Sequence, residues 1–216
     1  MRQILDGVFR WEVLHPDWTP EDAEGGQGWE RLVASYLVET RDGPVLIDPL
    51  VADESWDDLE RALDGRTPSI LLTLFWHTRS TAAVVERCPG AIVWAHEPAA
   101  GLVQERGAKP RTFVAGDALP GGIETIDVLR AYEVAFLVPE QRALAVGDVL
   151  LGSSDAGARL LPRSWHGGDY DELCEGLRSA LLPLEFDHLL LTHGEPVLGT
   201  GHEALERALH SPPSAE

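Results

Sequence analysis

Short apolar runs separated by turn residues make up most of the hydrophobic pattern of this chain. Runs of about four to eight residues that are rich in Val, Ile, Leu and Phe are typical of buried β-strands. The pair Asp42-Gly43 between the first two runs is a strong hairpin signal. The pattern therefore predicts strands at 35–40, 44–49, 69–75, 91–96, 111–117, 122–129, 133–139, 142–148 and 188–193.

Three other stretches have the spacing of amphipathic helices. Leu173, Leu177 and Leu181 recur every four residues after Asp169, a favourable N-cap residue. The same periodicity predicts a helix that begins at Ser55 and ends before Gly65, and a last helix that begins at Thr200.

The order of these elements favours two sheets over one. Strands come in groups of two or three with single helices between them, whereas a doubly wound parallel sheet would alternate strictly. We therefore predict an α/β (α+β) protein, a four-layer αββα sandwich that forms a single domain over residues 1–216. Its sheets should bury Val45, Leu46, Ile47, Leu71, Leu72, Ile92, Val93, Leu144, Val146, Leu190 and Leu191.

Residues 15–30 are rich in Gly, Pro and acidic side chains, and they predict a long loop with no element of its own. A loop of this length is often a lid over a functional site, but it is equally compatible with plain surface.

The composition excludes several classes of function. The 216 residues carry a formal net charge of −19, which repels nucleic acid and anionic membrane surfaces. Cys88 and Cys174 are too far apart to form a thiolate metal site or a disulfide framework. The chain begins without a basic segment followed by an apolar one, and no apolar run reaches the length of a membrane span. We expect a cytoplasmic protein that binds a small molecule, and neither nucleic acid nor a membrane.

The candidate chemistry lies just past the ends of predicted strands, where open sheets place their functional sites. The chain has neither a glycine-rich phosphate loop nor a Gly-x-Ser-x-Gly nucleophile motif. The apolar run of each of five predicted strands is instead followed by one carboxylate or imidazole, namely Asp48, His77, His96, Asp148 and His193. Such side chains can converge in one cleft.

Five blocks of sequence resemble the metallo-β-lactamase superfamily in the broad sense that includes glyoxalase II, over roughly residues 30 to 200. They are SYLVETRDGPVLIDPL, ILLTLFWHTRSTAAVV, FVAGDALPGGIETIDV, RALAVGDVLLG and LLLTHGEPV. The resemblance implies the αββα fold, a metal-dependent hydrolase of a small ester, thioester or amide, a bridging carboxylate at Asp148 and a metal-ligating imidazole at His193.

The sequence departs from this family at the metal-binding loop. The family motif Thr-His-x-His-x-Asp-His is replaced by Thr73-Leu-Phe-Trp-His77-Thr-Arg79-Ser, and only one of the histidines survives. The family's central histidine is also missing, because residues 129–133 read Leu-Arg-Ala-Tyr-Glu. A two-zinc site of the family pattern cannot be assembled from these residues.

Two hypotheses follow for what remains. In the first, His77, Asp148 and His193 hold one zinc or iron ion, with Glu133 as a fourth ligand. Arg79 and Glu133 are then the predicted catalytic residues, and Arg79 would stabilise a developing oxyanion.

In the second hypothesis the protein binds a small ligand without metal. Arg79 turns inward, forms an ion pair with Asp48, Asp148 or Glu133, and replaces the charge of the metal. Under both hypotheses the further pocket residues are expected to be Asp48, Trp76, His96 and Tyr132.

Overall fold

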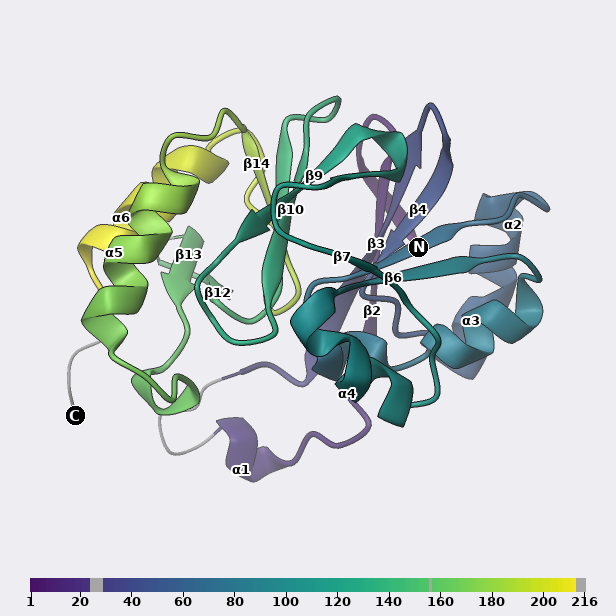
Figure 1. Cartoon of the computed structure of the whole chain (residues 1–216), viewed down its shortest axis with the longest axis horizontal. Coiled ribbons are helices and arrows are strands. Elements are labelled where there is room, and N and C mark those ends of the chain that lie inside the picture. The colour runs from purple at the N-terminus through teal and green to yellow at the C-terminus, as the bar shows by residue number, and fades with distance from the viewer. Residues whose placement is uncertain (24–28, 156, 213–216) are drawn as a thin grey trace.

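The protein, seen in a computed structural model that describes residues 1–23, 29–155 and 157–212, is built around two β-sheets (Figure 1). The larger sheet has its strands in sequence order, antiparallel as far as β4 and parallel from there on. These strands are β1 (Arg2–Leu5), β2 (Val8–Leu14), β3 (Leu32–Thr40), β4 (Gly43–Ile47), β5 (Ser69–Leu72), β6 (Ile92–His96) and β7 (Arg111–Phe113).

The smaller sheet has the order β14-β11-β10-β9-β8 and is antiparallel except for the parallel pair β11–β14. Its strands are β8 (Ala118–Leu119), β9 (Ile123–Asp127), β10 (Val134–Val138), β11 (Ala143–Val146) and β14 (His188–Leu191). A separate two-stranded hairpin is formed by β12 (Leu150–Ser153) and β13 (Gly157–Leu160).

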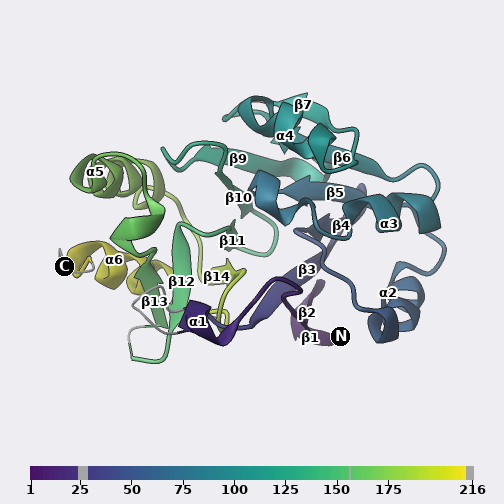
Figure 2. The ribbon, with the colours of Figure 1, turned by 90° about the horizontal axis from the view of Figure 1, so that it is seen from below.

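Helices cover the outer face of each sheet, so the molecule has four layers (Figures 1 and 2). The larger sheet is covered by α2 (Trp56–Leu63), α3 (Thr81–Arg87) and α4 (Ala100–Glu105), and the smaller sheet by α5 (Tyr170–Leu181) and α6 (Gly201–His210). The predicted αββα sandwich is confirmed. None of the helices in the described part of the chain is long and apolar enough to cross a bilayer.

Alternation along the strands explains the layers. In β4, Val45 and Ile47 pack between the two sheets, whereas Leu46 packs against the helices of the larger sheet. In β10, Phe136 faces the other sheet and Leu137 faces α5 and α6. Successive side chains of a strand point to opposite faces, so strands with apolar residues at every position are buried on both sides. Each such side chain contributes about 1.5–3 kcal/mol when fully buried.

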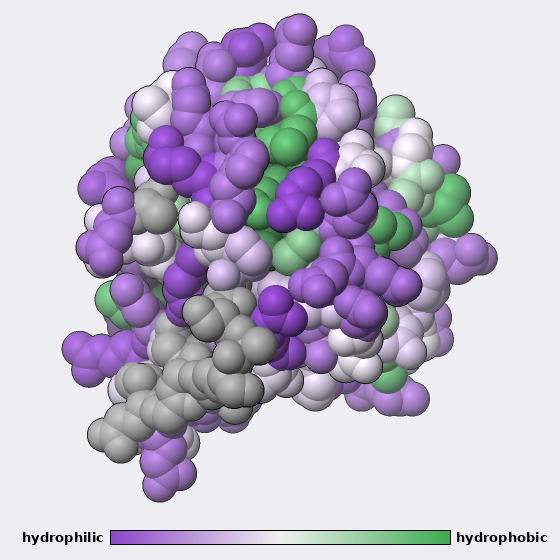
Figure 3. All heavy atoms as spheres, turned by 90° about the vertical axis from the view of Figure 1, so that its left-hand side faces the viewer, coloured by the Kyte–Doolittle hydropathy of each residue, from purple (hydrophilic) through white to green (hydrophobic). Residues whose placement is uncertain are grey.

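Hydrophilic side chains cover most of the face that carries α5 and α6 (Figure 3). The inner positions of α5, including Leu173, Leu177 and Leu181, are buried against the smaller sheet. The predicted N-cap is also present, because the Asp169 side chain accepts hydrogen bonds from the backbone N–H groups of Asp171 and Glu172. The four-residue periodicity thus predicted the correct inner face of this helix.

The structure corrects several details of the predicted elements. Ile92 lies in a strand as predicted but is only partly buried, because β6 is close to the edge of its sheet. Strands β1, β2, β8, β12 and β13 and helix α4 were not predicted. Residues 15–30 were expected to contain no element, yet a short helix, α1 (Pro20–Ala23), lies within them; residues 24–28 are outside the described part.

Candidate metal centre and cleft

The sheet register explains how distant residues meet at one end of the sandwich. In the parallel pair β11–β14, Val146 lies opposite Leu191. Asp148 and His193 each follow two residues later, so they leave neighbouring strands side by side. On the larger sheet, Asp48 follows β4 directly, and the parallel neighbour β5 leads into the loop that carries His77.

His77 is held in one orientation by groups behind it. A 3₁₀ turn, Phe75–Thr78, follows β5 and brings His77 back over the strand end, with its backbone N–H donating to the carbonyl of Leu74 at 3.0 Å. Nδ1 of His77 lies 2.9 Å from Asp48 Oδ2 and 3.1 Å from Thr73 Oγ1. A buried carboxylate next to Nδ1 favours the tautomer with its proton there, which leaves the lone pair of Nε2 to face the cleft.

Asp48 is itself fixed from both sides. The backbone N–H of Thr73 donates to its Oδ1 at 2.8 Å, and the Thr73 hydroxyl donates to its Oδ2 at 2.5 Å. Its backbone carbonyl accepts a hydrogen bond of 2.8 Å from the Ser35 hydroxyl. Asp48 therefore acts on the site through His77 and does not face the cleft, although it was predicted as a pocket residue.

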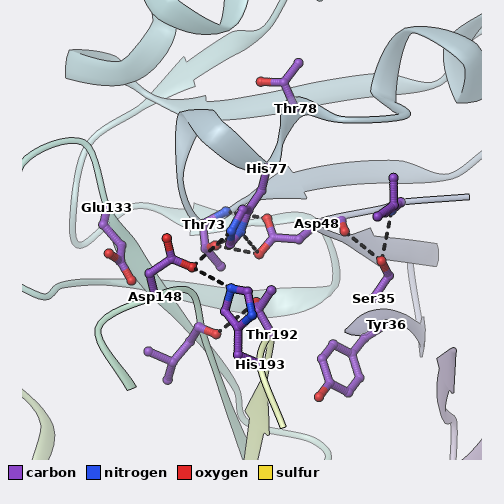
Figure 4. A network of polar contacts seen from close by, with 12 residues as sticks. Ser35, Tyr36, Asp48, Thr73, His77, Thr78, Glu133, Asp148, Thr192 and His193 are labelled. Atoms are coloured by element: carbon purple, nitrogen blue, oxygen red, sulfur yellow. Dashed lines mark hydrogen bonds and ion pairs between the residues drawn. The ribbon is translucent and has the colours of Figure 1, made fainter. Parts of the chain in front are cut away.

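His77, Asp148 and His193 converge (Figure 4). Oδ1 of Asp148 is 3.2 Å from Nε2 of His77 and 3.3 Å from Nε2 of His193, and the three ligand atoms lie within 4.8 Å of one another. Yet Oδ1 is buried without a hydrogen bond of normal geometry to any described residue. Ligand atoms that converge without bonding one another fit a metal ion with bonds of about 2 Å.

The electrostatics of the three groups suit this use. Burial works against the charged form of Asp148, but the facing imidazoles of His77 and His193 hold its pKa well below the ordinary value. Burial lowers the pKa of His193, which favours the neutral imidazole. Burial and Arg79 lower the pKa of His77, but Asp48 and Asp148 outweigh them and raise it, so a proton on Nε2 would compete with a metal ion.

Glu133, predicted as a fourth ligand and catalytic residue, does not join this group. Its carboxylate is fully buried, pairs closely with Nη1 of Arg130 and accepts a 2.8 Å hydrogen bond from the backbone N–H of Val149. Nη1 of Arg130 also lies 3.9 Å from Oδ2 of Asp148. The side of Asp148 that faces away from the histidines therefore meets a guanidinium.

Arg79 does not form the predicted ion pair. It turns inward, but no carboxylate of the described residues lies within 4.0 Å of its guanidinium nitrogens, and its buried Nε and Nη1 donate no hydrogen bond to them. Burial lowers the pKa of Arg79, and the more distant Asp48 and Asp148 offset only part of this effect. The prediction failed because the nearer cation, Arg130, takes Glu133.

The backbone at Arg79 is unusual. Its φ of 30° and ψ of −111° lie in a region that residues with a side chain rarely adopt. The loop is fixed behind it, because the Ser80 hydroxyl accepts a 2.9 Å hydrogen bond from the backbone N–H of Val51. Strained backbone of this kind persists only where the surroundings hold it, and it is common at functional sites.

A cleft of about 690 Å³ opens onto the three converging groups. It is lined by His15, Pro16, Asp17, Trp29, Leu50, Trp76, His77, Arg79, Ser80, Arg106, Asp148, Trp165 and His193. The described ends of the 15–30 segment thus form part of its wall. Trp29 packs edge-on against His193, with ring centroids 5.3 Å apart.

The remaining predicted pocket residues lie in three different places. Trp76 lines the cleft and is 58% exposed. Tyr132 lies in a neighbouring cleft of about 740 Å³, where its ring is edge-on to Phe75 at 5.6 Å. His96 is stacked on Phe113 at 5.9 Å and lines neither cleft, because β6 is two strands away from β4 in the larger sheet.

Several residues of the site were missed in the sequence, among them Arg130, Trp29 and Arg106. The spacing of Arg130 and Glu133 by three positions was a usable signal for a pair, although it is usually read on helices. Trp29 and Arg106 gave no signal, because their contribution depends on how two loops fold over the cleft.

No protein-family model and no curated protein matches the sequence. Solved structures do match. The metallo-β-lactamase family protein TTHA1429 from Thermus thermophilus is 18% identical over 96% of this chain and 80% of that one, with a TM-score of 0.65. A metallo-β-lactamase from Erythrobacter litoralis is 16% identical over 97% and 93%, with a TM-score of 0.67. TTHA1623, solved in a di-iron-bound form, is 30% identical over 80% of this chain and 92% of that one, with a TM-score of 0.60.

Proposed function

Because the chain belongs to the metallo-β-lactamase superfamily, we propose that it is a hydrolase of a small ester, thioester or amide that uses one metal ion. His77, Asp148 and His193 would hold the ion. The observation that carries this proposal is the convergence of their ligand atoms within 4.8 Å around an Asp148 oxygen that lacks a hydrogen-bond partner among the described residues.

A single ion is proposed, not two, because of what faces the second oxygen of Asp148. In the family pattern that this sequence resembles, the carboxylate bridges two metals. Here Oδ2 of Asp148 faces Arg130 at 3.9 Å. A second cation at that place would be repelled by the guanidinium. The metal-free hypothesis assigned to Arg79 the positive charge that replaces the metal. The arginine that lies next to Asp148 is instead Arg130.

The identity of the ion is proposed as iron or zinc. Two imidazoles and one carboxylate suit both metals. The relative that is 30% identical was solved with two iron ions, which supports iron.

A bound ion would supply a coordinated water with a pKa near 7 and would polarise the substrate carbonyl. The chain supplies orientation and charge. Asp48 and Thr73 fix the ring of His77, and Trp29 packs against the ring of His193. Arg79 lines the cleft, where the positive charge of its guanidinium would stabilise negative charge on a carbonyl oxygen.

The rival function is a small-ligand binding protein that needs no metal. The observation that favours it is the guanidinium of Arg79, which lines the same cleft as His77, Asp148 and His193 and has no ion-pair partner among the described residues. A guanidinium and a metal ion repel each other at short range. Under this alternative Arg79 binds the charged group of the ligand, and no metal ion takes part.

Metal analysis of protein purified without chelator decides between the two. We expect close to one equivalent of iron or zinc per chain in the parent, and less than about a tenth of that in His77→Ala and His193→Ala. His96→Ala is the matched control, because His96 ends a strand of the same sheet but lines neither cleft. Hydrolysis of small chromogenic esters and thioesters should follow the metal content. A parent protein without metal, even after incubation with Fe²⁺ or Zn²⁺, would contradict the hydrolase proposal.

A further inference from the structure

Arg79 has no ion-pair partner among the residues that the structure describes. Its Nε and Nη1 are buried, and neither donates a hydrogen bond to any residue that the structure describes. Leaving buried donors of a charged group unmade is costly, and more so than for neutral donors. The strained backbone of Arg79 adds to that cost and is held in place by the Ser80 contact. An arrangement this unfavourable in the free protein indicates a site prepared for a negatively charged group.

A second guanidinium lines the same cleft. Arg106 lies over the rings of Phe75 and Trp76, 4.7 Å and 4.4 Å from their centroids. These cation–π contacts hold the head of an otherwise exposed side chain at the rim. Asp17 and Asp148 line the same cleft, so in a chain with a net charge of −19 the two guanidinium groups are the places on this wall that would attract an anion.

The wall beside these charges is aromatic. Trp29, Trp76 and Trp165 line the cleft, and Trp76 and Trp165 also line the neighbouring cleft that contains Tyr132. The exposed face of Trp76 therefore lies between the two hollows. Large exposed rings beside a polar centre are a surface on which an apolar group can pack.

We propose that the cleft binds a small carboxylate with an apolar body, with its carboxylate on Arg79 and its body against Trp76. A carboxylate is inferred because the planar fork of a guanidinium matches its two oxygens. As a statement about the substrate, this rests on the proposed hydrolase function and names esters, thioesters or amides that carry a carboxylate. Binding itself rests on Arg79 and Trp76 and does not need a metal ion.

The test uses the full chain freed of metal by a chelator, with phenylacetate as the probe and calorimetry as the measurement. Phenylacetamide has the same shape without the charge, and it should bind at least about tenfold more weakly. Acetate lacks the ring and should also bind more weakly than phenylacetate. Equal binding of phenylacetate and phenylacetamide would overturn the inference, and this comparison needs no variant that has to fold.

Variants locate the site. Arg79→Gln should weaken phenylacetate binding at least about tenfold, because a charge-assisted pair is lost. Arg111→Gln is the control, since Arg111 is exposed and lines neither cleft, and it should bind as the parent does. Trp76→Ala should abolish the difference between phenylacetate and acetate. Unchanged binding in Arg79→Gln, or tighter binding of phenyl phosphate than of phenylacetate, would overturn the proposal.

The two proposals fail separately. If the purified protein holds no metal, the hydrolase function fails, yet phenylacetate binding to Arg79 still tests the carboxylate site. If metal is present and esters are hydrolysed, but charged and neutral esters react equally well and phenylacetate does not bind, the hydrolase function stands and the carboxylate site fails.

Discussion

Arg130 and Arg79 both lie in the neighbourhood of Asp148, yet their guanidinium groups differ in whether they have a partner. Arg130 pairs with the buried Glu133 and lies 3.9 Å from Asp148 Oδ2. Arg79 lines the cleft and has no ion-pair or hydrogen-bond partner among the described residues. Arg130 thus stabilises the folded structure through its ion pair, whereas Arg79 is available to bind a ligand.

The difference comes from local backbone and from burial. Arg130 lies in a tight loop that returns to β10, and its partner Glu133 is three residues away and fully buried. Carboxylate, guanidinium and the backbone N–H of Val149 together satisfy one another. Arg79 follows the 3₁₀ turn that presents His77, and the nearby carboxylates are already engaged. Asp48 is bonded to Thr73 and His77, and Asp148 faces two histidines.

The largest expected effect is on stability, at the pair that Arg130 forms with the buried Glu133. Arg130→Met should lower the free energy of unfolding by about 3–5 kcal/mol, the scale for leaving one partner of a buried ion pair uncompensated. Urea denaturation of the metal-free protein measures it. The double variant Arg130→Met/Glu133→Leu should recover most of the loss, because neither partner is then charged. A loss below about 1 kcal/mol in the single variant would contradict the assignment of Arg130 to the fold.

The same pair predicts a dependence on pH. Burial raises the pKa of Glu133, and Arg130 opposes this. Without Arg130, the folded state would hold the Glu133 proton more tightly than the unfolded state does. The penalty is then present above the unfolded pKa of a glutamate and shrinks as pH falls toward it. The stability difference between the parent and Arg130→Met should therefore be smaller at pH 5 than at pH 8, and a difference that widens on acidification would contradict it.

The next effect is expected on metal affinity, where Asp148 faces His77 and His193. Asp48→Asn keeps the size of the side chain but weakens the carboxylate contact to His77 Nδ1. Groups that orient metal-bound histidines typically contribute 10–100-fold in affinity. We expect zinc or iron to bind about 10–100-fold more weakly, measured by competition with a chelator. Asp127→Asn, an exposed carboxylate at the end of β9, is the control; equal affinity in Asp48→Asn would show that His77 does not need this orientation.

The sequence predicts that His77, Asp148 and His193 meet, because regular strands position these residues. Apolar runs such as 44–49 and 142–148 fix the strands, and polar residues after parallel strands meet at one edge. In-register β11 and β14 thus place His193 beside Asp148. The motif offset at His77 is absorbed by the 3₁₀ turn, since an imidazole four residues after Thr73 still reaches Asp48.

The pair of Arg130 with Glu133 and the wall of the cleft depend on irregular backbone that the sequence does not signal. Leu129 and Tyr132 have φ of 54° and 66°, values for which glycine would have been the usual cue. These turns direct Arg130 toward Glu133. Glu133, which was expected to be a metal ligand, therefore pairs with Arg130 and does not face the cleft. Trp29 and Arg106 reach the cleft only through the folding of their loops. Contacts set by loop geometry carry no periodicity from which to predict them.

The smallest effect on stability is expected for Arg79, and it is the sharpest test of the comparison. Arg79→Ala breaks no hydrogen bond or ion pair among the described residues, so it should change the free energy of unfolding by about 1 kcal/mol or less. Removal of a buried unpaired charge offsets the packing lost with the side-chain stem. Adding phenylacetate should raise the melting temperature of the metal-free parent but not that of the variant, because only a ligand that binds the folded state stabilises it. A loss of about 3 kcal/mol without ligand would instead place Arg79, like Arg130, in the framework of the fold.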